Sequence, residues 1–187
     1  MVARLLDGFS RPWFVAGGSA IDLFVGRETR RHKDIEIAIL RRDQLTLQRH
    51  LAGWQFEFFL PYTTGESRPW SEGTWLESPI HEIHGRVDNV PPLEILLNES
   101  DGSDWVFRRD HRVRRPLTEL SAAATADSVP FLAPEIVLLY KAAEPGPADE
   151  ADFRAVRRSL DGHQRQWLAE ALQKAYPLCP WRSELAA

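Results

Sequence analysis

Residues 13–40, which read WFVAGGSAIDLFVGRETRRHKDIEIAIL, decide the fold of this chain. A short apolar run breaks at Gly17-Gly18-Ser19 and passes into an apolar helical segment, which predicts a strand, a turn and a helix with Ser19 as its N-cap. The stretch closes on an alternating run that predicts a half-buried strand at about 34–40. Asp34 and Glu36 are two residues apart there, so both carboxylates should lie on one face. Neighbouring carboxylates repel each other, and the pair therefore indicates a site for a cation.

Composition and charge narrow the class of protein. The 187 residues, 43% of them hydrophobic and 27% charged, predict one soluble domain, or one domain with an appendage. A net charge of -4 makes nucleic acid an unexpected partner for the protein as a whole. Cys179 is the only cysteine, which excludes an internal disulfide and a cysteine metal cluster and favours the cytoplasm. The longest apolar runs fall short of the roughly 20 residues of a membrane span, so we expect no membrane segment.

Strand patterns occupy the first part of the chain and helix patterns the last. Alternation predicts further strands at about 54–58, 81–87 and 93–97, whereas apolar residues at helical spacing predict three helices after Pro134. This order predicts an α+β or α/β core, residues 1–112, followed by a small helical C-terminal region, residues 113–187. The segment 61–79 is rich in Pro, Gly, Ser and Thr and is long for a loop, which makes it a candidate lid or binding loop.

The turn at Gly17-Gly18-Ser19 has two interpretations. It lacks the lysine of a Walker A loop and the three glycines of the dinucleotide fingerprint, so it could be an ordinary turn between a strand and a helix. It also brings free backbone N–H groups and the positive end of a helix to one spot, which a phosphate can approach without meeting a Cβ. A phosphate site followed by paired carboxylates is what metal-dependent transfer from a nucleoside triphosphate needs, because Mg²⁺ takes carboxylate and phosphate oxygens.

Such a site needs a further carboxylate and further cations. Glu94 stands alone in an apolar strand, where an acid is costly to bury without a partner, and Glu82 is its competitor. The histidines beside Glu82 fit a structural or substrate-facing role better than a role as metal ligands. Between the two motifs, Arg27 to Lys33 is strongly basic and could offset the charge of a triphosphate, or could be a solvated loop. Lys141, at the end of the helix after Pro134, has the same two interpretations.

The order of these motifs is similar to that in the nucleotidyltransferase superfamily that includes DNA polymerase β. The string GGSAIDLFVGRETRRHKDIEI most resembles the branch of aminoglycoside adenylyltransferases and lincosamide nucleotidyltransferases. The resemblance implies a mixed sheet flanked by helices, and transfer of a nucleotidyl group from Mg-ATP or another nucleoside triphosphate to a hydroxyl of a small molecule, such as an aminoglycoside- or lincosamide-like antibiotic. It also implies two Mg²⁺ ions held by Asp34, Glu36 and Glu94, and a donor nucleotide held by Gly17, Gly18, Ser19, Arg30, His32 and Lys141.

The chain departs from that family at two positions. Glu36 stands where the resistance enzymes usually have aspartate, and Ala148 stands where they usually have a lysine that helps to hold the nucleotide. Two alternatives therefore stay open. One is a catalytically impaired relative that acts as a nucleotide-sensing or antitoxin-like binding module. The other is a binding protein whose segment 61–79 closes on an apolar ligand in an aromatic pocket remote from Asp34. The resemblance names neither the acceptor nor the oligomeric state.

Overall fold

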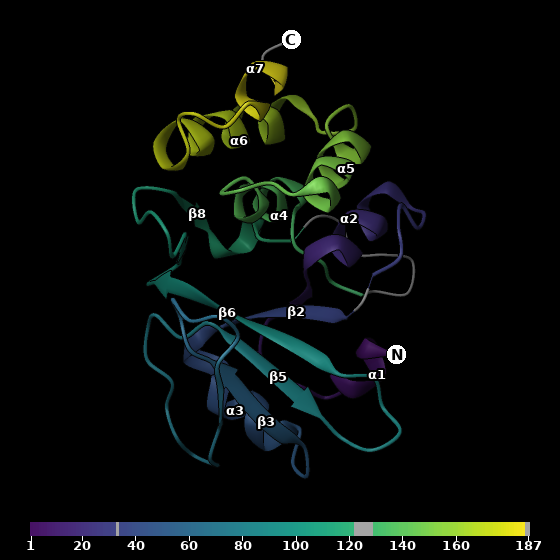
Figure 1. Cartoon of the computed structure of the whole chain (residues 1–187), viewed down its shortest axis with the longest axis vertical. Coiled ribbons are helices and arrows are strands. Elements are labelled where there is room, and N and C mark those ends of the chain that lie inside the picture. Colours follow the sequence, from purple (N-terminus) through teal and green to yellow (C-terminus); the bar gives the residue numbers. More distant parts are fainter. Residues whose placement is uncertain (33, 122–128, 186–187) are drawn as a thin grey trace.

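The computed structural model describes residues 1–32, 34–121 and 129–185; Lys33, in the predicted basic connection, lies outside these ranges. A mixed sheet crosses the middle of the molecule, with helices on both faces (Figure 1). Its main path runs β1-β2-β6-β5-β3-β4, and only the central pair, β2 and β6, is parallel. The strands are β1 (Trp13–Val15), β2 (Ile35–Leu40), β3 (Gln55–Phe59), β4 (Ser67–Pro69), β5 (Glu82–Arg86), β6 (Leu93–Asp101), β7 (Asp104–Val106) and β8 (Arg114–Pro116).

The helices divide between the two faces of this sheet. Beneath it lie α1 (Val2–Leu5) and α3 (Gln44–His50), the latter preceded by a 3-10 turn at Arg41–Asp43 (Figure 1). Above it lie α2 (Gly17–Val25), α4 (Pro134–Lys141), α5 (Pro147–Val156), α6 (Gly162–Ala175) and α7 (Trp181–Leu185). A second 3-10 turn covers Leu117–Glu119. Within the described ranges, none of these helices has the length and apolar character needed to cross a bilayer.

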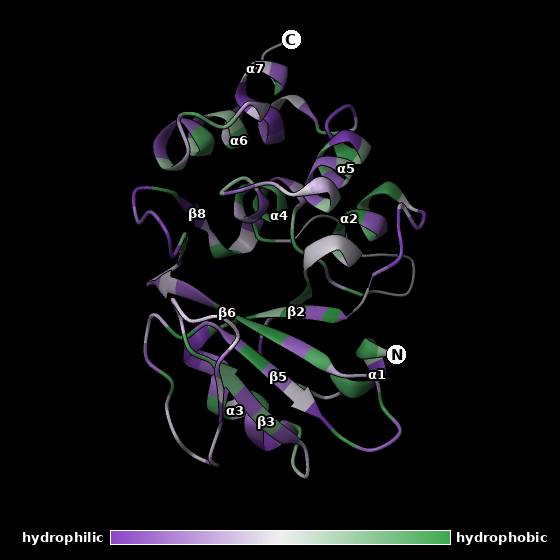
Figure 2. Cartoon of the chain, viewed as in Figure 1, coloured by the Kyte–Doolittle hydropathy of each residue, from purple (hydrophilic) through white to green (hydrophobic). Residues whose placement is uncertain are grey.

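Strand β2 is apolar on both faces, and its alternation sorts side chains between two hydrophobic cores. Ile37 and Ile39 are buried in the lower core with Leu47 of α3. Ala38 and Leu40 are buried in the upper core, which contains the helices α2 and α4 to α7. Because side chains alternate along a strand, Glu36 shares the upper face with Ala38 and therefore points toward those helices. Figure 2 shows hydrophobic residues, in green, along the central strands and on α4.

The α+β class and the mixed sheet with flanking helices are confirmed, but element boundaries differ in places. Helix α2 begins at Gly17 with Ala16 as its N-cap, so the prediction of Ser19 as the N-cap is wrong: Ser19 already lies in the first helical turn. Gly26 ends the helix in the left-handed conformation, with φ of 76°, a conformation that favours glycine at a helix C-terminus. Strand β8 joins the sheet through β7, so the region after residue 112 begins with sheet structure before its helices.

The segment 61–79 packs against the lower core and α3 and does not cover a binding site. Trp70 is 5% exposed and packs in the lower core. Gln44 of α3 accepts a hydrogen bond from the Leu76 backbone N–H at 2.8 Å, and Gln48 accepts one from the Gly73 N–H, also at 2.8 Å. Buried side-chain amides that bond backbone in this way fix a loop firmly. The structure therefore contradicts the interpretation of this segment as a lid.

Candidate active site

Two glutamates lie side by side on the upper face of the sheet. Glu36 of β2 is directly opposite Glu94 of β6 in the parallel pair. Neighbouring strands are about 4.8 Å apart, so the two side chains extend next to each other toward the helices. The sheet thus brings together two carboxylates that are far apart in the sequence, as the family resemblance implied.

The carboxylate of Glu36 lies against the beginning of α2. A Cβ added at Gly17 would fall 1.5 Å from Glu36 Oε2, so only glycine leaves room for it, and Gly17 has a φ of +56°. Burial raises the pKa of Glu36, while Lys141 and a hydrogen bond from the Gly18 backbone N–H act against that shift. The positive end of α2 therefore faces a carboxylate of the site as well as the space above it.

The carboxyl group of Glu94 has a strongly raised pKa. Burial, together with repulsion from Glu36, Glu82 and Asp34, raises its pKa to about 8. Its neighbour on β5 is His84, whose Nε2 lies 3.1 Å from Glu82 Oε1. Among the described residues, Glu82, His84 and Glu94 form the group whose possible ligand atoms all lie within 4.8 Å of one another. The sequence prediction treated Glu82 only as a rival of Glu94, but the fold places the two beside each other.

Asp34 lies one residue before β2 and is exposed. It is close enough to Glu94 to raise the pKa of that acid. Ser19 is half-buried within the first turn of α2. Asp34 therefore lies near the Glu36–Glu94 pair, and Ser19 follows two residues after Gly17, the residue against which Glu36 lies.

Asp22 of α2 organises the first half of the basic connection. It accepts hydrogen bonds from the backbone N–H of Thr29 at 2.9 Å and from the Thr29 hydroxyl at 2.5 Å. Its other oxygen lies 2.6 Å from His32 Nε2. Burial alone would raise the pKa of Asp22, but the bonds from Thr29 and His32 outweigh it and lower the pKa. His32 is thus held over Gly18, where a Cβ would fall 2.4 Å from its ring.

A buried ion network joins the basic connection to the upper helices. The guanidinium of Arg30 donates to both oxygens of Asp152 at 2.9 and 3.0 Å, and the Asp152 side chain is fully buried. Lys141 contacts Asp152 at 3.0 Å and Asp149 at 2.8 Å, with its own side chain 16% exposed. Lys141 is therefore not a solvated helix-end lysine. Arg30 and His32 lie against Gly18 at the beginning of α2, and Lys141 lines the same cavity as Gly17.

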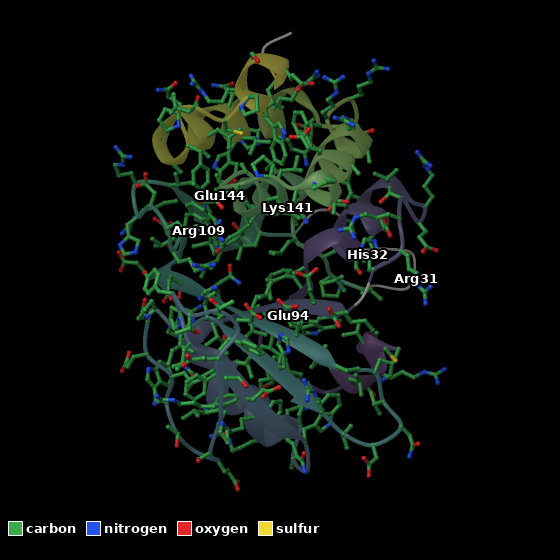
Figure 3. All side chains as sticks on the ribbon, viewed as in Figure 1. Arg31, His32, Glu94, Arg109, Lys141 and Glu144 are labelled. Atoms are coloured by element: carbon green, nitrogen blue, oxygen red, sulfur yellow. The ribbon has the colours of Figure 1, made fainter. Side chains whose placement is uncertain are left out.

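A cavity of about 740 Å³ separates the sheet from these helices. Glu36, Glu82 and Glu94 lie on its sheet side, and Arg108, Arg109 and Lys141 lie on the opposite side. Figure 3 shows Glu94 on the sheet facing Lys141, with Arg109 and Glu144 farther along and His32 near α2. The cavity therefore has an acidic floor, and its roof carries three cations as well as Glu144 and Asp149. Carboxylates facing cations in this way suit a metal ion together with a phosphorylated ligand.

Four residues of the site are missing from the sequence prediction. Asp22 could have been identified from the sequence, because it is the one acid in the apolar run of α2. No local sequence pattern marks Asp152, because its partners Arg30 and Lys141 come from other segments of the chain. Arg108 and Arg109 are consecutive cations directly after β7, a position that sequence alone does not connect with Glu94.

Comparisons with known proteins agree with this architecture. A family model described as aminoglycoside-2''-adenylyltransferase matches residues 1–62. No curated protein sequence matches the chain. The crystal structure of ANT(2'')-Ia in complex with adenylyl-2''-tobramycin is 18% identical, with a TM-score of 0.59 over 92% of this chain and 93% of that one.

Two further structures give the same result. The solution structure of the antibiotic-resistance factor ANT(2'')-Ia is 17% identical, with a TM-score of 0.61 over 98% of this chain and 93% of that one. The lincomycin-bound lincosamide adenylyltransferase LnuA is 14% identical, with a TM-score of 0.55 over 82% of this chain and 90% of that one. The resemblance drawn from residues 13–40 is thereby confirmed. The chain has the nucleotidyltransferase fold of the aminoglycoside and lincosamide adenylyltransferases.

Proposed function

We propose that this protein is a cytoplasmic, magnesium-dependent nucleotidyltransferase that moves AMP from ATP to a hydroxyl of a small molecule. The observation that carries the proposal is the position of Glu36 and Glu94 on the cavity floor, next to the beginning of α2. In-line displacement at a phosphorus needs cations at the phosphates and an acid–base group at the attacking hydroxyl. The cavity offers both within one space.

The carboxylates of the floor fit a hard divalent cation. Glu94 carries a pKa of about 8 because burial and three neighbouring acids disfavour its charge, and a cation would relieve that repulsion. Asp34, Glu36 and Glu94 would hold Mg²⁺, whose contribution is to neutralise the phosphates and polarise the reacting oxygens. Glu82 and His84 line the outer side of Glu94 and would orient it.

The donor nucleotide would lie at the end of the cavity that contains α2. Gly17, Gly18 and Ser19 supply the helix N-terminus that attracts phosphate. Arg30 and Lys141 bring cations to the same place and His32 brings an imidazole ring, and their contacts with Asp22 and Asp152 hold these side chains there. Lys141 supplies a cation in a region where Ala148 replaces the usual lysine of the family.

The acceptor hydroxyl would attack the α-phosphorus from the side of Glu94. A bond forms between that oxygen and the α-phosphorus while the bond to the bridging oxygen of the β-phosphate breaks. Pyrophosphate leaves, and Glu94 takes the hydroxyl proton. With a cation beside it Glu94 would be ionised, and an ionised carboxylate at the attacking hydroxyl can accept that proton.

The two alternatives find less support. A catalytically impaired module would be favoured by displaced acids, whereas Glu36 and Glu94 keep their register in adjacent strands. An apolar-ligand protein would need segment 61–79 to form a pocket, whereas that segment packs on α3. Catalysis is therefore the better-supported function.

The proposal is tested by calorimetry and by pyrophosphate release. Titration with Mg²⁺ and a non-hydrolysable ATP analogue should show saturable binding that disappears in the presence of a chelator. A panel of hydroxyl-bearing acceptors, including tobramycin and lincomycin, should then reveal pyrophosphate release that depends on one acceptor class. Absence of binding for every nucleoside triphosphate would overturn the proposal, and binding without transfer for any acceptor would favour the nucleotide-sensing module.

Gly17→Ala should weaken binding of the Mg²⁺–analogue complex by about 10- to 100-fold, the usual range when support of a metal ligand is disturbed. The new methyl group would occupy the place of Glu36 Oε2 and displace that carboxylate. Gly26→Ala is a matched control: its φ of +76° imposes the same backbone strain, about 1–2 kcal/mol, but no atom lies within 4 Å of the added Cβ. Equal losses of affinity in the two variants would show that strain alone, not Glu36, is responsible.

A further inference from the structure

The cavity extends along strand β6, from one end near α2 to a far end near Asn98. Glu94 pairs with Glu36 at the end near α2. Leu96 lies opposite Glu82, and the Leu97 N–H donates to the carbonyl of His81. Successive residues of a strand advance about 3.3 Å, so the wall extends about 7 Å from Glu94 to Leu96 and about 13 Å to Asn98.

Two arginines stand at the far end without an acidic partner. The guanidinium of Arg108 lies 5.6 Å from the centre of the Tyr140 ring, and that of Arg109 lies 5.7 Å from it. Arg109 donates to the Tyr140 carbonyl at 2.8 Å and to the Tyr176 hydroxyl at 3.2 Å, which are neutral groups. Within residues 1–32, 34–121 and 129–185, neither arginine has a carboxylate oxygen within 4.0 Å, whereas Arg30, Arg41 and Arg115 all do.

This pairing of like charges is unfavourable until an anion joins it. Burial lowers the pKa of Arg108, and the charge of Arg109 lowers it further. Burial is the main cause of a lowered pKa of His81, and the charge of Arg108 acts in the same direction. Glu82 attracts Arg108 only from beyond ion-pair distance. An arginine fork in such a place matches the geometry of a carboxylate or a phosphate.

We propose that Arg108, supported by Arg109, binds an anionic group of the acceptor, so that the acceptor is a hydroxyl compound carrying a carboxylate or phosphate rather than a polycationic amino sugar. The proposal rests on the proposed function, since it assigns the donor to the α2 end and the acceptor to the other. A polycation would meet two arginines of like charge there, which costs affinity. The distance along β6 sets the separation between the reacting hydroxyl and the anion at about 7–13 Å.

Inorganic phosphate and tobramycin are the two probes of the acceptor end. The protein is first saturated with Mg²⁺ and the non-hydrolysable ATP analogue, so that the donor end is occupied. Phosphate should then bind with a millimolar dissociation constant, and tobramycin should neither bind nor displace it. Arg108→Gln should weaken phosphate binding at least tenfold, Arg108→Lys should have an intermediate effect because it keeps the charge without the fork, and Arg114→Gln, at an exposed arginine paired with Asp101, should have none.

Three results would overturn the proposal. One is tobramycin binding in preference to phosphate, and a second is phosphate binding that is unchanged in both Arg108 variants while their thermal melts match the parent protein. The third is a tenfold loss of affinity for the ATP analogue itself in Arg108→Gln, which would assign the anion to the donor's phosphates. If the analogue binds to no form of the protein, the proposed function fails instead, and the effect of Arg108→Gln on phosphate binding to the free protein still decides the anion site.

Discussion

Glu94→Gln should lower the rate of nucleotidyl transfer by about a thousandfold, within the range expected for loss of a group that moves the proton. The amide cannot take the hydroxyl proton and is a poorer ligand for Mg²⁺, while its shape keeps the fold intact. Pyrophosphate release under saturating Mg-ATP measures the effect, and circular dichroism checks the fold.

Glu82→Gln is the matched control for that variant. Glu82 lies two strand positions away on β5, next to Glu94, and belongs to the same group of possible ligands. We expect it to lower the rate by less than about tenfold, because it orients Glu94 instead of meeting the substrate. A thousandfold loss in Glu82→Gln together with a mild effect in Glu94→Gln would show that Glu82 takes the proton and Glu94 orients it.

Glu94→Gln should also change how stability depends on pH in the metal-free protein. The folded-state pKa of about 8 lies above the ordinary value of 4.5, so folding favours the protonated acid. The corresponding stability is complete below about pH 4.5 and is lost as the pH rises through 8. After a discount for partial exposure, we expect a contribution of about 2 kcal/mol, measured by urea unfolding in a chelator. The variant should lack this loss.

Asp152→Ala should destabilise the protein by about 3 kcal/mol, or roughly 6–12 °C in Tm. The Asp152 side chain is fully buried between Arg30 and Lys141, and its removal leaves two cations without their shared partner. Lys141 keeps Asp149, and Arg30 is 28% exposed, which holds the expected cost near the lower end for a broken buried pair.

The control is an ion pair of the same length on the surface. Asp101 lies 2.9 Å from Arg114, the same distance as between Asp152 and Arg30, but its side chain is 69% exposed. Asp101→Ala should cost less than about 1 kcal/mol, because water screens the pair. Calorimetric melts of both variants compare them directly, and similar Tm values would contradict the role given to burial.

The strands that carry Glu36 and Glu94 could be predicted, because the pattern of apolar and polar neighbours along a short segment is enough to indicate a strand. The alternation in residues 34–40 is enough to place Glu36 on the face opposite Ile37, and the structure confirms this. The apolar run around Glu94 predicted a strand for the same reason, and β6 covers it. That Glu94 joins Glu36 at one site came only from the family resemblance, and the parallel pairing of their strands was not predicted, since no local pattern encodes which strands pair.

What sequence could not supply depends on contacts between distant segments. Asp152 looked like an ordinary helix acid, and only the fold shows that Arg30 reaches it across more than a hundred residues. Ser19 was misassigned because Gly17, with a positive φ, starts the helix earlier than cap preferences suggest. Arg108 and Arg109 gave no sign of facing a cavity, since two adjacent arginines after a strand are usually solvated.

The two halves of the chain should unfold in a single cooperative transition. Helix α2 of the N-terminal part packs on α4 and α5, and the backbone of Val15 in β1 exchanges hydrogen bonds with Pro130 and Leu132. Neither half can therefore bury its apolar surface without the other. A fragment ending near residue 112 should remain largely unfolded even though it contains both glutamates. Without the residues after 112, the apolar surfaces of α2 and β1 would stay exposed to water.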